Sequence, residues 1–230
     1  MYEDRKEAGR TLAERLRTTV DHGPVIVLAL PRGGVPVAAE VARRLSVPLD
    51  LCYVRKLGAP SQPELAIGAV ADGVEPRVVL NSRLIAELCV SDGYVAATTE
   101  RKIADIERQR ALYQPGRLPP MLAGRTVILV DDGLATGTTA RAALRAVRAA
   151  GAERVILAVP VAPAATVAEL AQEADAVVCP ITPDPFFAVG QQYRRFPQVC
   201  DQDVVTALRS AAEDADIDSG EREGSDHDAA

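Results

Sequence analysis

The chain has 230 residues, of which 48% are apolar and 25% are charged, with a formal net charge of −6. This composition is typical of a globular protein, and a chain of this length can bury a core without disulfides or a structural metal. The four cysteines are far apart and only two histidines occur. The sequence therefore gives no basis for a zinc site or a histidine-dependent triad.

The beginning of the chain is rich in charged residues, so it cannot serve as the apolar part of a secretory signal. The longest apolar run, residues 155–165, contains two prolines and is about half as long as a membrane span. We therefore expect a cytoplasmic protein with no membrane partner.

Apolar residues near the N-terminus recur every three or four positions, which predicts an amphipathic helix over residues 3–20. After this helix, short apolar segments alternate with segments of helical pattern. The predicted strands are 25–30, 49–54, 126–130, 154–159 and 176–179, and the predicted helices between them are 36–45, 138–150 and 164–173. Strands that are apolar throughout and alternate with helices indicate the α/β class, with an open parallel sheet and helices on both faces.

Two regions depart from this alternation. Residues 55–75 are rich in glycine and proline, with one candidate strand at 66–70, and resemble a long functional loop. Residues 81–116 have helical spacing and predict a helical excursion from the sheet, which either covers other parts of the protein or binds a partner.

The last residues, 211–230, contain eight acids and one arginine and almost no large apolar side chain. We expect them to form a disordered acidic tail after a domain over residues 1–210. The tail carries a charge of −7, so the domain carries +1. The expectation that no nucleic acid is bound therefore depends on the lack of a basic cluster and of a DNA-binding motif, rather than on the total charge.

The most specific motif is TVILVDDGLATGTT, residues 126–139. A predicted buried strand leads into Asp131 and Asp132 and then into a turn of small residues that opens a helix. Ligands bind at the carboxyl ends of parallel strands, and backbone N–H groups at a helix N-terminus can hold a phosphate. The candidate phosphate-binding residues are Gly133, Leu134, Ala135, Thr136, Gly137, Thr138 and Thr139.

The two carboxylates would repel a phosphate unless the ligand also offers them hydroxyl groups. Carboxylates accept hydrogen bonds from sugar hydroxyls and can hold a nearby Mg²⁺, so a ribose 5-phosphate fits the motif. A receiver domain would have its acids after the first strand, and a helix N-cap needs only one carboxylate. A P-loop is excluded because its motif is absent.

The stretch VILVDDGLATGTT resembles the ribose-phosphate fingerprint of the type I phosphoribosyltransferases, many of which have glycine at the position of Thr138. The resemblance covers residues 3–208 and is closest to bacterial and archaeal members of unassigned substrate. It implies the type I phosphoribosyltransferase fold, with a small hood at about 180–200 and the helical insertion at 81–116. It also implies a homodimer.

The resemblance further implies a pyrophosphate site. The segment LALPRGGV looks like the family's pyrophosphate loop, in which Gly33 and Gly34 let the backbone approach a diphosphate and Arg32 contributes charge. Without the resemblance, this segment reads as an ordinary strand-to-helix turn. Arg55 and Lys56 are similar to the family's basic pair, which contacts the leaving pyrophosphate before a loop that closes over the site.

The segment ITPDPFFAVG, residues 181–190, looks like the base-binding stretch of hypoxanthine-guanine-type enzymes. This likeness implies that Phe187, or else Phe186, stacks on a base, with Asp184 beside it. A role in the core for one of these phenylalanines stays open. The residues after the glycine differ from those of the purine enzymes, so the acceptor stays open.

Taken together, the resemblance implies an enzyme that requires Mg²⁺ and transfers ribose 5-phosphate from 5-phosphoribosyl-1-pyrophosphate (PRPP) to a nucleobase or another small nitrogen nucleophile. Asp131 and Asp132 would fix the ribose hydroxyls and hold Mg²⁺ indirectly, through PRPP. Arg55 and Lys56 would act with them in catalysis by contacting the released pyrophosphate. Two alternatives stay open: a regulator of the same fold that senses PRPP or a nucleotide, and a sugar-phosphate-binding protein that hydrolyses its ligand.

Overall fold

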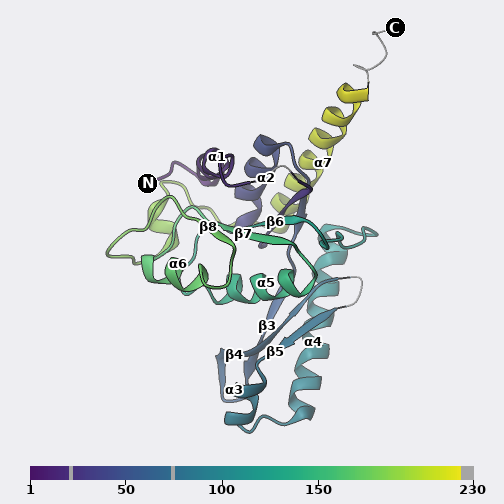
Figure 1. Ribbon diagram of the computed structural model, residues 1–230, viewed down its shortest axis with the longest axis vertical. Helices are drawn as coiled ribbons and strands as arrows, with labels where there is room; N and C mark the ends of the chain where they lie inside the picture. Colours follow the sequence, from purple (N-terminus) through teal and green to yellow (C-terminus); the bar gives the residue numbers. More distant parts are fainter. Residues whose placement is uncertain (21–22, 74–75, 224–230) are drawn as a thin grey trace.

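The computed structural model describes residues 1–20, 23–73 and 76–223 (Figure 1). The helices are α1 (Arg5–Leu16), α2 (Gly34–Leu45), α3 (Ser82–Glu87), α4 (Asp92–Tyr113), α5 (Thr138–Ala149), α6 (Ala164–Leu170) and α7 (Asp201–Glu223), with the short 3₁₀ helix η1 (Val189–Gln192). The strands are β1 (Val25–Ala29), β2 (Leu49–Leu51), β3 (Val54–Ala59), β4 (Gln62–Ala71), β5 (Arg77–Leu80), β6 (Thr126–Val130), β7 (Arg154–Ala158) and β8 (Ala176–Val178).

A five-stranded parallel sheet forms the centre of the molecule, with the strand order β2-β1-β6-β7-β8. The chain passes from β1 to β2 on one side and later returns to place β6 on the other side of β1. This reversal makes a switch point between β1 and β6, where open parallel sheets bind ligands beyond the carboxyl ends of their strands. The predicted α/β class and parallel sheet are confirmed.

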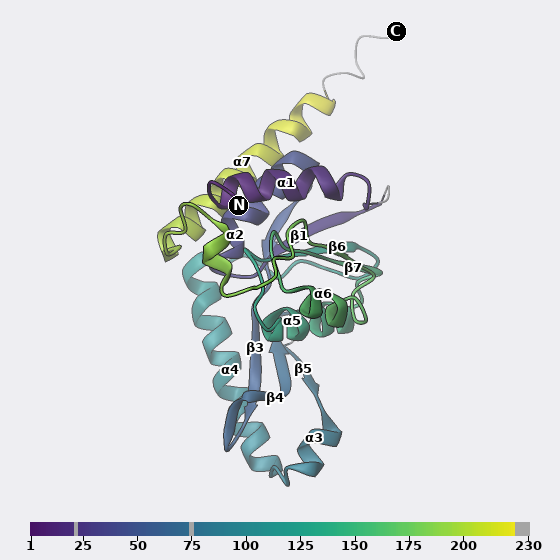
Figure 2. The same ribbon diagram turned by 90° about the vertical axis from the view of Figure 1, so that its left-hand side faces the viewer.

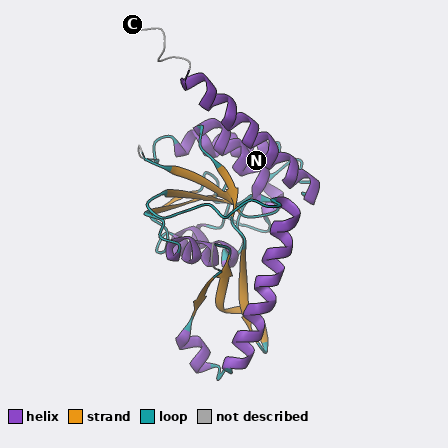
Figure 3. Cartoon of the chain, turned by 90° about the vertical axis from the view of Figure 1, so that its right-hand side faces the viewer, coloured by secondary structure: helices purple, strands orange, loops and turns teal. Residues whose placement is uncertain are grey.

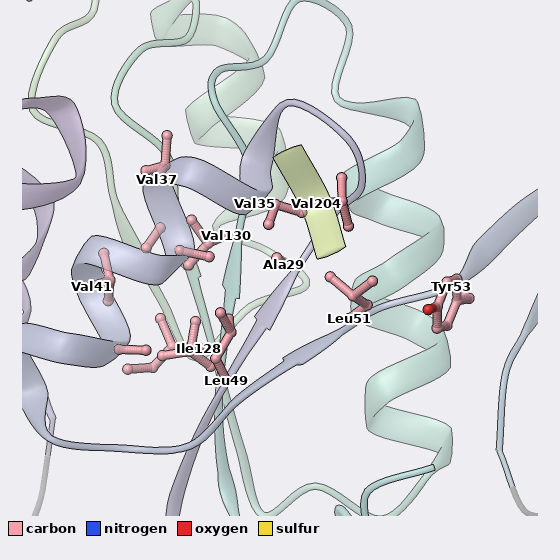
Figure 4. Close-up of a cluster of buried hydrophobic side chains, with 14 of the residues drawn as sticks. Ala29, Val35, Val37, Val41, Leu49, Leu51, Tyr53, Ile128, Val130 and Val204 are labelled. Atoms are coloured by element: carbon pink, nitrogen blue, oxygen red, sulfur yellow. The ribbon is translucent and has the colours of Figure 1, made fainter. Parts of the chain in front are cut away.

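Helices cover both faces of this sheet, with α1, α2 and α7 on one side and α5 and α6 on the other (Figure 1). Alternate strand residues face opposite layers. Ala29 and Ile128 pack in the first layer together with Val41 of α2 and Val204 of α7 (Figure 4). In the second layer, a buried cluster contains Leu28, Leu129, Ala143 and Leu144. Burial on both faces explains why these strands are apolar throughout.

The region expected to be a long loop, residues 55–75, instead contains β-strands, so that prediction was wrong. The chain leaves the parallel sheet after Leu51 and forms an antiparallel sheet of order β3-β4-β5. A Cβ at Gly58 would lie 2.4 Å from the Pro63 carbonyl oxygen, and the pairing register shifts at this glycine. Glycine therefore permits the close approach of the two strands, where sequence reasoning read it as a loop signal.

Helices α3 and α4 lie beside the antiparallel sheet within the range predicted to be helical (Figures 2 and 3). We call residues 54–113 the arm. Tyr94 on α4 donates a hydrogen bond to the Gly58 carbonyl oxygen at 3.0 Å. Near the parallel sheet, Arg110 forms an ion pair with Asp72 at 2.8 Å. The strands of the arm and the residues next to them are therefore held to α4 near both ends of this helix.

Helix α7 continues to Glu223 instead of ending near residue 210, which differs from the expected boundary of the tail. Val204 and Leu208 are buried in the first half of the helix. Once a packed segment has formed, adding residues to a helix is easier than nucleating a new one. Residues 224–230 lie outside the described part of the chain. In the part that is described, no helix combines the length and apolar character that a membrane crossing needs.

Candidate active site

The loops that follow β1 and β6 meet at the switch point. Gly33 lies so close to the second acid that a Cβ placed on it would be 2.2 Å from Asp132 Oδ2. A Cβ at Gly34 would be 2.7 Å from the Val130 carbonyl oxygen and 2.9 Å from Asp131 Cα. Gly34 therefore leaves no room for a side chain, and one at Gly33 would have to displace Asp132. The predicted pyrophosphate loop and acidic pair lie in one crevice.

The two adjacent acids differ in their surroundings. Burial raises the pKa of Asp131 well above its usual range, and the charge of Asp132 raises it further. The Asp131 Oδ1 atom accepts a hydrogen bond from the Asp132 backbone N–H at 2.8 Å. Asp132 instead forms an ion pair with Arg5, whose Nε and Nη2 atoms both lie 2.8 Å from Asp132 Oδ2. The site therefore contains one carboxyl whose pKa is raised by burial and one that has a cationic partner.

The turn after the acids leads directly into α5. Gly137 has a φ of 69° and is the N-cap of this helix, which has no side-chain cap. Its first backbone N–H groups are therefore suited to an anionic ligand. Leu134 departs from the expectation, because its N–H donates to the Val161 carbonyl oxygen at 2.9 Å. The part of the turn suited to a phosphate is thus residues 135–139.

Arg32 follows β1 at the edge of the crevice, and the peptide bond between Pro31 and Arg32 is cis. Its guanidinium lies 3.5 Å from Asp201 Oδ1, at the start of α7. Tyr113, at the end of α4, donates a hydrogen bond to the same oxygen at 2.6 Å. The position of Arg32 is therefore connected to two helices outside its own loop.

The basic pair Arg55 and Lys56 lies within β3 and does not precede an irregular loop. The expected closing loop at this position is instead the ordered hairpin of β3 and β4. The Arg55 guanidinium donates hydrogen bonds to Gln109 of α4 and to the Val54 carbonyl oxygen. Gln109 also donates to the Tyr113 hydroxyl at 3.4 Å. Arg55 is thus linked to the crevice through α4.

The three predicted base-binding residues of the hood differ in their surroundings. Phe187 is 73% exposed, Asp184 is exposed, and Phe186 packs against a cluster that includes Tyr2 and Tyr193. Another aromatic residue, Phe196, lines a cavity of about 530 Å³ at the crevice. The residues that line this cavity include Arg5, Arg32, Gly33, Asp132, Val189 and Phe196.

Arg5 and Phe196 are the site residues that sequence reasoning missed. Arg5 is the first residue of α1, where an arginine reads as an ordinary charge on a helix surface. Phe196 lies outside the stretch that resembles a base-binding motif. The sequence shows only that Arg5 lies near the start of a predicted amphipathic helix. Its partner, Asp132, is 127 residues away.

The described residues contain no cluster of three or more His, Cys, Asp or Glu side chains that could hold a metal ion by themselves. The donor set consists of Asp131 and Asp132. Mg²⁺ is commonly bound through one or two carboxylates together with substrate phosphates. The site therefore fits a Mg²⁺ ion that is held largely by oxygen atoms of a bound ligand.

A parallel sheet with a helix N-terminus, two acids and a glycine loop at its switch point defines an α/β protein built to bind a phosphorylated ligand. The phosphoribosyl transferase domain model matches residues 1–194. The chain therefore belongs to the phosphoribosyltransferase family. This result confirms the resemblance on which the sequence analysis relied.

Two of the relatives named below are similar to the chain over most of its length, and a third is similar over about a third of it. A Mycobacterium tuberculosis (strain H37Rv) protein that bears the provisional name phosphoribosyl transferase Rv0571c is 47% identical over 215 residues, which is 93% of this chain and 48% of that protein. The chain thus spans about half the length of this curated relative. The crystal structure of TT1426 from Thermus thermophilus has a TM-score of 0.82 and 41% identity, covering 91% of this chain and 98% of that chain. The bifunctional protein PyrR of Brevibacillus brevis is 41% identical over 80 residues, 35% of this chain and 45% of that protein.

Proposed function

We propose that the chain binds PRPP in the crevice between the loops after β1 and β6 and transfers its ribose 5-phosphate group to a nitrogen nucleophile. The observation that carries this proposal is the close approach of Gly33 to Asp132. It brings an arginine-containing loop, an acidic pair and an uncapped helix N-terminus into one place. A ligand with a phosphate at each end and hydroxyl groups between them matches this arrangement.

The roles that we propose follow the charges of the site. Residues 135–139 would hold the 5-phosphate with backbone N–H groups and threonine hydroxyls. Asp131 and Asp132 would accept hydrogen bonds from the ribose hydroxyls. The Arg32 loop would bind the pyrophosphate. Arg55 and Lys56 of the arm would contact the same pyrophosphate once the arm and the Arg32 loop have moved closer together.

In the proposed reaction, the bond between ribose C1 and the pyrophosphate oxygen breaks and a bond from C1 to the acceptor nitrogen forms. An acceptor nitrogen that carries a proton releases it to solvent, whereas a pyridine nitrogen carries none and becomes cationic. Positive charge develops on the ribose ring and negative charge on pyrophosphate. Carboxylates beside the ring and guanidinium groups beside the leaving group stabilise these opposite charges. Mg²⁺, when bound with PRPP, would neutralise part of the pyrophosphate charge.

The test is pyrophosphate release from PRPP and Mg²⁺ across a panel of purines, pyrimidines and nicotinate-like acids. We expect release with at least one acceptor, and we expect the double variant Asp131→Asn, Asp132→Asn to lose it while remaining folded. Asp105→Asn on α4 is the control, because this acid lies on the surface of the arm. Unchanged release by the double variant would contradict the proposal.

The same panel separates the enzyme from the alternative of a regulator. If PRPP binds but no acceptor in the panel causes it to release pyrophosphate, the result would favour the regulator. Release that requires no acceptor would favour a hydrolase. We also propose, from the family resemblance, that the protein is a homodimer, which light scattering of the purified protein would test.

A further inference from the structure

Arg5 is the most deeply buried cationic side chain at the crevice, with a relative exposure of 8%. Three kinds of contact hold its guanidinium. Nε and Nη2 contact Asp132 Oδ2 at 2.8 Å, and Nη1 donates to the Pro197 carbonyl oxygen at 2.7 Å. The guanidinium carbon also lies 3.7 Å from the centre of the Phe196 ring. This side chain is therefore fixed in direction as well as in place.

The segments around Arg5 are built to keep it there. The backbone of Tyr2 pairs with residues 192–194, and its hydroxyl donates to the Pro160 carbonyl oxygen at 3.2 Å. The rings of Tyr193 and Phe196 stack with their centres 4.8 Å apart. Phe196 therefore contacts both the Arg5 guanidinium and the Tyr193 ring.

These contacts converge on one acid. The Tyr193 hydroxyl donates to the Asp132 backbone carbonyl oxygen at 2.6 Å, while Arg5 holds the Asp132 side chain. A carboxylate can accept about four hydrogen bonds. Arg5 provides one of them, from Nε to Oδ2, and its Nη2 atom lies 2.8 Å from the same oxygen. The carboxylate therefore keeps acceptor capacity for a ligand after its orientation has been fixed.

We propose that Arg5 is a positioning residue, which holds the Asp132 carboxylate in the orientation that receives the sugar hydroxyls of the substrate. This inference rests on the proposed function. Arg5 itself acts through Asp132 and needs no contact with the reacting atoms. The N-terminal helix, which the fold places beside the sheet, thereby becomes part of the site.

The test compares Arg5→Ala, Arg5→Lys and the control Arg10→Ala in pyrophosphate release. Arg10 lies on the same helix, is about half exposed, and has its nearest carboxylate 3.9 Å away on Glu40. Misplacing a group by about 1 Å can cost about 100-fold in rate, so we expect Arg5→Ala to lower kcat about 100-fold. Lysine keeps the charge but has a single nitrogen, so it cannot contact Asp132 Oδ2 and the Pro197 carbonyl oxygen in the same geometry, and Arg5→Lys should also fall below the wild type. Arg10→Ala should retain the wild-type kcat.

Chemical rescue separates positioning from a general loss of structure. Millimolar guanidinium should restore part of the kcat of Arg5→Ala, whereas urea, which carries no charge, should not. Thermal melting shows which variants are folded, and Arg5→Lys decides the question if Arg5→Ala does not fold. A wild-type kcat in Arg5→Lys, or a folded Arg5→Ala that guanidinium does not rescue, would overturn the inference.

The proposed function and this inference can fail separately. If the wild type releases no pyrophosphate with any acceptor, the proposed function fails. The affinity for ribose 5-phosphate, measured by calorimetry on the wild type and Arg5→Lys, then decides the role of Arg5. Weaker binding by the variant would support it. Equal affinity, or no binding by either protein, would overturn it.

Discussion

The two acids of the crevice illustrate how neighbouring residues of the same type can have different properties. Burial, followed by the charge of Asp132, raises the pKa of Asp131. Asp132 is paired with Arg5 at 2.8 Å. The two carboxyls therefore differ in their surroundings although they are adjacent in the sequence.

The raised pKa of Asp131 predicts how stability depends on pH. The folded protein binds this proton more tightly than the unfolded chain does, so the stability it contributes is present below the ordinary pKa and is lost as the pH rises through the raised one. We expect Asp131→Asn to increase Tm at neutral pH, with a gain that shrinks toward about pH 4, the ordinary pKa of this side chain. Thermal melts over this pH range measure the effect.

Asp175 is the matched control for this experiment, because its shift has the opposite sign. Burial raises its pKa, but the Val155 backbone N–H and the Arg148 guanidinium outweigh burial and lower it. Its stability contribution is therefore present at neutral pH and lost as the pH falls through the lowered pKa, so Asp175→Asn should lower Tm at neutral pH. A lower neutral-pH Tm in Asp131→Asn as well would show that the buried carboxyl is not destabilising.

The substitution Gly33→Ala tests whether the loops after β1 and β6 must lie this close together. A Cβ at this position would lie 2.2 Å from Asp132 Oδ2, so Gly33→Ala must displace the acid or the loop. We expect PRPP turnover to fall about 100-fold, since a displacement of about 1 Å has effects of this size. Gly93→Ala is the control, because a Cβ there meets nothing within 4 Å. Equal turnover by the two variants would show that the loops tolerate separation.

At the scale of elements, α4 connects strand β3 of the arm with the crevice. The Arg55 guanidinium contacts Gln109, which contacts Tyr113, and the Tyr113 hydroxyl holds Asp201 beside Arg32. Each member lies on a different turn or element, so the contacts join β3, α4, α7 and the loop after β1. The helix therefore couples the predicted basic pair to the predicted pyrophosphate loop.

Tyr113→Phe tests this coupling, because it removes only the hydroxyl that donates to Asp201 at 2.6 Å. One hydrogen bond contributes about 1 kcal/mol, so we expect pyrophosphate to bind about fivefold more weakly. Tyr94→Phe is the same substitution on the same helix, and it removes a hydrogen bond to Gly58 at the far end of the arm. Calorimetry with pyrophosphate should detect weaker binding only for Tyr113→Phe. Equal affinities would separate α4 from the crevice.

At the scale of the whole molecule, the sequence predicted the parallel sheet because its strands are buried on both faces and carry an unbroken apolar pattern. It also predicted the acids and the glycine loop, because they lie directly after such strands. In the arm, the helical range and the strand at 66–70 were predicted, but the rest of the antiparallel sheet was read as a loop. Gly58 is a strand residue at a close approach, since a Cβ there would lie 2.4 Å from the Pro63 carbonyl oxygen. Local sequence cannot distinguish such glycines from loop residues.

The remaining parts of the site depend on contacts between distant segments. Arg5 meets Asp132 across 127 positions, and Tyr113 meets Asp201 across 88. No local pattern specifies such pairs, since each residue reads as an ordinary member of its helix. The fold also brings Phe196 to the crevice, which the sequence did not predict, whereas the contact of the exposed Phe187 with a base stays a prediction.

The central claim is that one crevice at the β1–β6 switch point binds both ends of PRPP. Calorimetric titration of the protein with PRPP and Mg²⁺ tests it most directly, with pyrophosphate and ribose 5-phosphate as separate competitors. We predict a single class of sites from which either competitor displaces PRPP, and weaker binding in Gly33→Ala. Absence of binding, or binding that neither competitor affects, would contradict the claim.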